Sequence, residues 1–93
     1  MDAERLAEEV ALVDQARGAL ARGDGSAAIA ALDQYEARFT QRKFAPEALY
    51  LRMEALLKLG RTSAGRAVAA RLVAGYPRSP HTARARQVLA TIP

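Results

Sequence analysis

The chain has 93 residues, no cysteine and a formal net charge of +4 at pH 7. This length allows one small domain, and the missing cysteines exclude a disulfide framework and thiolate chemistry. The composition is 51% hydrophobic, but much of that is alanine and only 5% is aromatic, which favours helix throughout. No apolar run approaches the roughly 20 residues of a membrane-spanning helix. The acidic start, MDAERLAEEV, also lacks the basic region of a signal peptide. We therefore expect no transmembrane segment and no signal peptide in this chain.

Charge is distributed unevenly along the chain. Residues 1–54 hold all ten acids and seven of the Lys and Arg residues, so this part carries a net −3. Residues 55–93 hold the other seven Lys and Arg residues and no acid, so this part carries +7. The charge of the chain is therefore polarised from one end to the other.

The first expected helix runs from about Asp2 to about Arg22, and a second runs to about Thr40. The expected apolar stripe of the first helix consists of Leu6, Val10, Val13 and Leu20, with Leu12, Ala16 and Ala19 beside it. Gly18 inside this helix indicates close approach of a neighbouring helix. Gly23 ends the helix in the left-handed conformation that glycine tolerates, and Asp24 or Ser26 is expected to cap the next one.

The stretch from Phe44 to Pro77 reads as a second helical hairpin. Proline suits the first turn of a helix, so Pro46 is expected to open one, and Gly60 breaks the pattern before the next helix. Pro77 ends the hairpin. A fifth helix is expected to begin at Ser79 and Pro80, with Ser79 as the N-cap, and to run to about Thr91.

The two hairpins repeat at an offset of 37 residues, within the range of stacked helical repeats. The aligned pairs are Gly23 and Gly60, Ala27 and Ala64, Leu32 and Ala69, Tyr35 and Leu72, and Phe39 and Tyr76. A single hairpin cannot bury its apolar face alone, whereas a stack of two with a terminal helix can.

This pattern resembles the tetratricopeptide repeat family. The residues that carry the resemblance are Ala16 and Met53 at the small-residue position of the first helix, the turns Gly23-Asp24 and Gly60-Arg61, the small Ala28 and Gly65, and the closing Tyr76-Pro77. APEALYLRMEALLKLGR and YPRSPHTARARQVLA look most like the variant in bacterial cell-envelope proteins, such as outer-membrane assembly lipoproteins and the Tol–Pal coordinator. The match covers about residues 10–91. The resemblance implies a bacterial protein of the periplasm or cell envelope, and the cytoplasm remains the other compartment.

The predicted fold is therefore all-α, a tetratricopeptide-like solenoid of about five helices in one domain over residues 1–93. Hairpin 1 is expected at about 2–40, hairpin 2 at about 45–76 and a capping helix at about 80–91. Two repeats and one helix are fewer than the three repeats of a typical free-standing array. This shortfall indicates a fragment of a longer protein, an atypical stack or an oligomer.

The sequence offers few groups for catalysis. His81 is the single histidine, so no catalytic triad can form, and its position favours an exposed residue at a helix start. No Cys, His or carboxylate cluster has metal-ligand spacing, and the GDGS segment lacks the lysine of a phosphate-binding loop. We therefore expect no enzyme activity, no cofactor and no bound metal.

Two surfaces are candidates for binding. The concave side of a helical stack is lined by the first helix of each pair, and this side is expected to hold Gln15, Tyr50, Arg52 and Glu54. The acid-free end presents Arg78, Arg84 and Arg86 to an acidic partner.

The leading functional hypothesis is a non-catalytic scaffold that binds a protein or peptide. A variant of it is a homodimer, in which the acidic first helix of one copy meets the basic last helices of another. The alternative is binding of nucleic acid or another anionic surface by the basic end. Nucleic acid is the less favoured partner, because single-strand binders place aromatic residues among the basic ones and Tyr76 is the one aromatic residue after residue 50.

Overall fold

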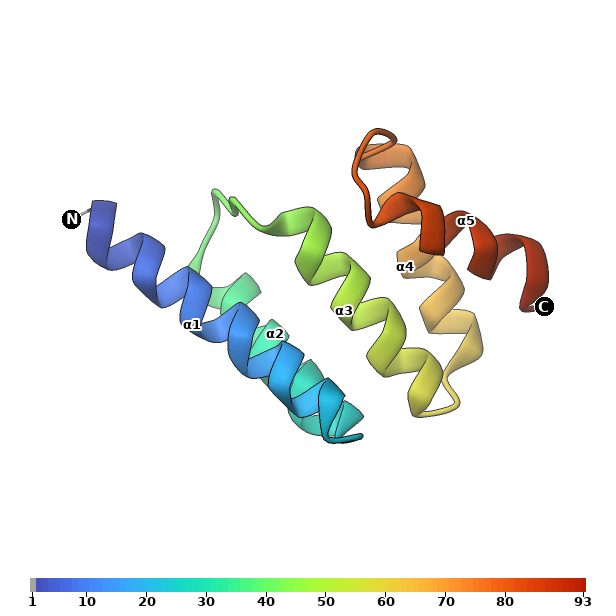
Figure 1. Cartoon of the computed structure of the whole chain (residues 1–93), viewed down its shortest axis with the longest axis horizontal. Helices are drawn as coiled ribbons and strands as arrows, with labels where there is room; N and C mark the ends of the chain where they lie inside the picture. Colours follow the sequence, from blue (N-terminus) through green and yellow to red (C-terminus); the bar gives the residue numbers. More distant parts are fainter. Residues whose placement is uncertain (1) are drawn as a thin grey trace.

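The structure, a computed structural model, describes residues 2–93. Over these residues the chain forms five α-helices and no strand, so the prediction of an all-α fold with five helices is confirmed. The helices are α1 (Asp2–Ala21), α2 (Gly25–Arg38), α3 (Ala45–Lys58), α4 (Thr62–Gly75) and α5 (Thr82–Thr91). They are arranged in chain order along the long axis of an elongated body of 43 × 28 × 19 Å (Figure 1).

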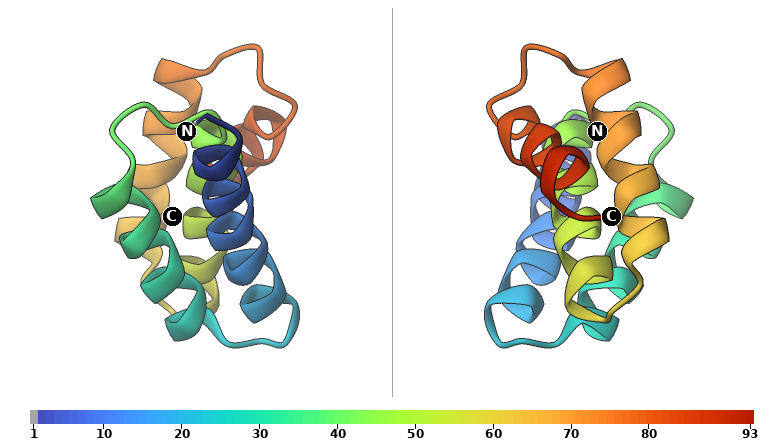
Figure 2. Two further views of the ribbon diagram at one scale, coloured as in Figure 1. Left: turned by 90° about the vertical axis from the view of Figure 1, so that its left-hand side faces the viewer. Right: turned by 90° about the vertical axis from the view of Figure 1, so that its right-hand side faces the viewer.

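The helices form two layers with α3 between them. The two end views show α1 and α5 on one side and α2 and α4 on the other (Figure 2). Consecutive helices pack against each other, and α3 also contacts both α1 and α5. We refer to the side built by α1, α3 and α5 as the front face, since it faces the viewer in Figure 1.

The backbone repeats at the same 37-residue offset as the sequence. Gly23 and Gly60 adopt φ values of +80° and +77°, which favour glycine because it lacks a Cβ. In the first turn the amide of Gly23 donates to the carbonyl of Leu20, and in the second the amide of Gly60 donates to that of Leu57. The first residue of α5, Thr82, follows that of α3, Ala45, by the same offset. In this register α5 is therefore the first helix of a third unit.

Two large buried clusters and a small one of Ala19, Ala28 and Ala55 form the core, and each includes residues of α3. Cluster 1 lies between α1, α2 and the start of α3, and consists of Leu12, Val13, Ala16, Ala31, Leu32, Tyr35, Phe39, Ala48 and Leu51. Cluster 2 lies between α3, α4 and α5, and consists of Met53, Leu56, Val68, Ala69, Leu72, Ala85 and Val88. Because α3 faces both clusters, it links the two ends of the molecule.

The buried face of α1 differs from the expected stripe. Leu6 and Val10 are 40% and 39% exposed, while Glu9 is only 4% exposed. Val10 is exposed because it lies off the buried face of α1, which consists of Glu9, Leu12, Val13, Ala16 and Ala19. Leu6 is exposed because α1 has 20 residues and α2 has only 14. Arg38 at the end of α2 pairs with Glu8, so the residues that precede Glu8 extend past the end of α2.

Other local expectations need correction. Helix α5 begins at Thr82 rather than at Ser79 and Pro80, because Ser79 closes a turn by accepting the amide hydrogens of His81 and Thr82. Gly18 makes no close helix contact, since a Cβ there would meet only the Arg22 guanidinium, at 3.5 Å. Of the two candidate caps of α2, Asp24 is the one that accepts the amide hydrogen of Ala27, at 3.0 Å.

Candidate functional site

A pocket of about 440 Å³ opens between α1, α3 and α5. We call it the front pocket, and its lining residues are Leu20, Tyr50, Glu54, Leu57, Lys58 and Arg84. Two leucines supply apolar surface, one tyrosine supplies an aromatic ring, and three residues supply charge. The pocket therefore combines an apolar wall with charged groups of both signs, as ligand-binding pockets commonly do.

Tyr50 and Glu54 lie one helical turn apart on α3 and both contact residues of the α5 region. The Tyr50 ring stacks on the His81 ring with 5.0 Å between centroids. Nε of Arg84 donates to Oε2 of Glu54 at 3.1 Å, and Nη1 of Arg84 donates to Oε1 of Gln87 at 3.1 Å. These contacts hold the side chains in fixed positions at the edge of the front pocket.

The same contacts shift the proton affinities of two of these groups. Burial raises the pKa of Tyr50, and the negative charge of Glu54 raises it further. The hydrogen bond from Arg84 to Glu54 raises the pKa of the Arg84 guanidinium. Both side chains are therefore locked in their ordinary protonation states at neutral pH, which suits recognition rather than proton transfer.

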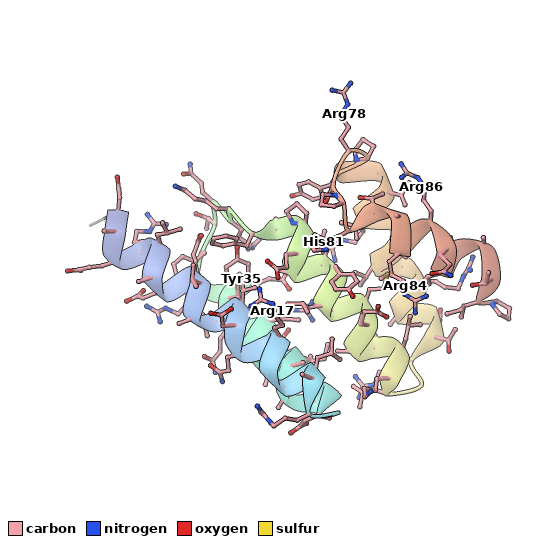
Figure 3. All side chains as sticks on the ribbon, in the orientation of Figure 1. Arg17, Tyr35, Arg78, His81, Arg84 and Arg86 are labelled. Carbon is pink, nitrogen blue, oxygen red and sulfur yellow. The ribbon has the colours of Figure 1, made fainter. Side chains whose placement is uncertain are left out.

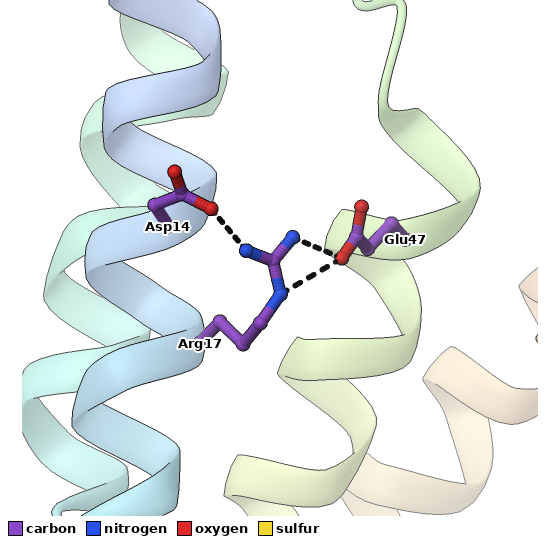
Figure 4. A network of polar contacts seen from close by, with 3 residues as sticks. All are labelled: Asp14, Arg17 and Glu47. Carbon is purple, nitrogen blue, oxygen red and sulfur yellow. Dashed lines mark hydrogen bonds and ion pairs between the residues drawn. The ribbon is translucent and has the colours of Figure 1, made fainter.

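A second ion pair joins α1 to α3 in the same way as Glu54 and Arg84 join α3 to α5. Arg17 on α1 forms hydrogen bonds with Glu47 on α3 and with Asp14 on its own helix (Figure 4). Arg17 and Glu54 are 37 residues apart, as are Glu47 and Arg84. Equivalent positions of the repeat thus form an ion pair at both junctions, with the signs of the charges exchanged.

Only some of the binding residues expected from the sequence lie at the front pocket. Tyr50, Glu54 and Arg84 come together at the front pocket. Arg52 instead points to the α2 side of α3, where its Nη2 pairs with Asp33 at 2.8 Å and with Glu36. The expectation that Arg52 lines the same face as Tyr50 is therefore wrong, because the two residues lie two positions apart on one helix.

The other selected residues do not line this pocket. Gln15 is exposed on α1. Arg78 extends away from the body into solvent, and Arg86 lies on the far edge of α5 (Figure 3). Nη2 of Arg86 donates to the carbonyl oxygen of Pro77 at 3.1 Å.

At the basic end, residues 55–93, some arginines already bind other groups of the protein. Arg84 is paired with Glu54, and Nη1 of Arg66 donates to the carbonyl oxygens of Leu89 and Ile92. Charge at this end is therefore partly used to fasten α4 and α5 to each other and to α3. Nucleic-acid binding favours a continuous stripe of cations that have no other partner, and these contacts interrupt such a stripe.

Sequence reasoning missed His81 as well as the leucines of the front pocket. His81 is half-buried against Tyr50 rather than an exposed residue at the helix start. The repeat contained a signal for this, since His81 follows Phe44 by 37 residues and both directly precede the first helix of a unit. A ring is therefore placed at the same position in both units.

Within residues 2–93 no group of three or more His, Cys, Asp or Glu side chains could hold a metal ion. None of the helices in this range combines the length and the apolar character needed to cross a membrane. Comparison of the chain with protein-family models, with curated proteins and with solved structures gives no match. The front pocket and the repeat are therefore the basis for assigning a function.

Proposed function

We propose that the protein is a non-catalytic interaction module of the tetratricopeptide type, which binds a peptide segment of a partner protein at the front pocket. The observation that supports this most directly is the recurrence of helices, turns and ion pairs at a 37-residue offset. Such a repeat presents the first helix of each unit on one face, and here that face carries the pocket.

The chemistry of the pocket indicates the kind of peptide that fits. Leu20 and Leu57 offer contact for one apolar side chain of the partner. Lys58 is exposed and makes no ion pair with the acids of residues 2–93, so it is available to a carboxylate. We infer a ligand segment with an apolar anchor residue and a neighbouring Asp or Glu.

Selection from a library of random twelve-residue peptides on the immobilised protein tests this function. Enriched peptides should contain an apolar residue next to an acid, and Lys58→Glu should weaken their binding about tenfold by replacing attraction with repulsion. Arg78→Glu is the matched control, because it makes the same charge change at an exposed site outside the pocket. Peptides that bind Lys58→Glu as well as the unchanged protein, or a library from which nothing is enriched, would refute the proposal.

We further propose that a second copy of the chain is one of its partners. The exposed Leu6 and Val10 lie on the acidic first helix, and the opposite end of the molecule carries the excess of positive charge. Contact between these ends would cover apolar surface and join opposite charges. Sedimentation should then show a dimer at low salt that dissociates at high salt and in the Val10→Arg variant. A monomer at high protein concentration in low salt would exclude this interaction.

A further inference from the structure

A second pocket lies on the opposite side of α3 from the front pocket, where α2, α3 and α4 meet the connection between hairpins. Its volume is about 150 Å³. We call it the arginine pocket, because Arg42, Arg52 and Arg71 from three different segments line it together with a single acid, Glu36. Neither the repeat nor the proposed peptide site makes use of it.

The three arginines differ in what neutralises them. Arg52 is satisfied by Asp33 and Glu36. Nη2 of Arg42 donates to the main-chain carbonyl oxygen of Glu36 at 3.2 Å, and Arg42 forms no ion pair with the acids of residues 2–93. Arg71 is exposed on α4 and forms no ion pair with the acids of residues 2–93. The pocket therefore carries positive charge that an anion could balance.

The remaining walls are apolar or aromatic. Ala45 and Leu49 lie on the α3 side, Leu32 lies on the α2 side, and Tyr76 stands at the end of α4 with 37% of its surface exposed. A cavity of about 150 Å³ with apolar walls accommodates a molecule of the size of benzene. The cavity thus has room for about six carbon atoms. It is too small for a folded segment or a nucleotide.

We propose that the arginine pocket binds a small monocarboxylate whose apolar body has about six carbon atoms. The planar guanidinium groups of Arg42 and Arg71 match the two oxygens of a carboxylate, while Leu49 and Tyr76 cover the apolar body. A phosphate ion would match the charge but not the apolar walls, because it keeps its hydration and offers no apolar surface. This site is independent of the proposed peptide site, since the two pockets share no lining residue.

Titration of the ¹⁵N-labelled protein with sodium benzoate at constant ionic strength tests the proposal. A ligand of this size is expected to bind with a Kd on the order of 1 mM. The amide resonances of Leu49, Arg71 and Tyr76 should shift together along one binding curve. Benzamide, which has the same shape without the charge, should bind at least about tenfold more weakly, and inorganic phosphate should not displace benzoate at equal concentration.

Two variants locate the anion. Arg71→Gln should weaken benzoate binding about tenfold without loss of fold, because Arg71 is exposed and has no ion pair to lose. Arg78→Gln makes the same change at an exposed arginine outside the pocket and should leave the Kd unchanged. Equal binding of benzamide, full competition by phosphate, or shifts at Lys58 and Arg84 instead would overturn the proposal. Shifts at Lys58 and Arg84 would instead show that the front pocket takes an apolar carboxylate, whereas the other two results would not bear on peptide binding there.

Discussion

Glu9 is an ionisable residue that the fold buries almost completely. The residue is 4% exposed, and its Oε2 has no hydrogen-bond partner in the part of the chain that the structure describes. Arg5, Arg42 and Lys43 line the same surface hollow as Glu9, but none of the three forms an ion pair with it. A buried carboxylate oxygen without a hydrogen bond has lost its hydration, and cations beyond ion-pair distance compensate its charge only in part.

We predict that replacing Glu9 stabilises the protein. Glu9→Leu removes the buried charge, keeps a side chain of similar size and should raise the free energy of unfolding by about 1–3 kcal/mol. The midpoint of urea unfolding measures the change. Glu8→Leu is the control, because Glu8 is exposed next to Glu9 and its pair with Arg38 is exposed too, so its effect should stay within about 0.5 kcal/mol. A lower midpoint for Glu9→Leu would mean that the carboxylate has a stabilising partner after all.

Local backbone features were the most predictable part of the chain, and side-chain exposure along α1 was the least. Gly23 takes the left-handed conformation and Asp24 caps α2, both because the chemistry of these residues allows few other roles. Leu6 and Val10 were expected inside because they are apolar, whereas the structure exposes them. The exposure of Leu6 depends on where α2 ends, and that of Val10 depends on which face of α1 packs against its neighbours. Both are properties of helices together rather than of one residue.

Between elements, the ion pairs define how the first helices of successive units align. Arg17 with Glu47 and Glu54 with Arg84 span the same number of residues and occupy equivalent positions of the repeat. The paired residues lie 30 positions apart, and no local sequence pattern indicates such a pair. The residues of the front pocket could therefore not be predicted from hydrophobic periodicity alone. The 37-residue offset would have related the two pairs to each other once one of them was known.

We predict that exchanging the charges of the second pair preserves the fold. Glu54→Arg alone places like charges together and should lower the free energy of unfolding by about 0.5–1 kcal/mol, as should Arg84→Glu, because both side chains are partly exposed. The double variant restores opposite charges, in the arrangement that Arg17 and Glu47 already have, and should recover most of the loss.

Urea unfolding of the four proteins at low and high salt measures this coupling. High salt should reduce it, because the pair is partly open to solvent. A double variant whose loss equals the sum of the two single losses would show that the pair does not couple α3 to α5.

At the scale of the whole molecule, α3 is the element on which the rest of the fold depends. Ala48 and Leu51 belong to cluster 1, and Met53 and Leu56 belong to cluster 2, so one helix supplies both cores. The all-α class and the helix count followed from composition and from the glycine and proline breaks. That α3 belongs to both clusters depends on how its side chains pack against the helices on either side. No single segment of the sequence determines this packing.

We predict from this sharing that both hairpins unfold in one transition. Val13 in cluster 1 and Val88 in cluster 2 are 2% and 0% exposed, and truncation of either to alanine should cost about 1–3 kcal/mol. Because α3 cannot stay folded with only one of its faces covered, each variant should lower hydrogen-exchange protection equally in α1–α2 and in α4–α5. Exchange of the slowest amides, followed residue by residue, measures this. If Val88→Ala reduced protection in α4 and α5 alone, the two clusters would be independent units and the assignment of α3 as their link would fail.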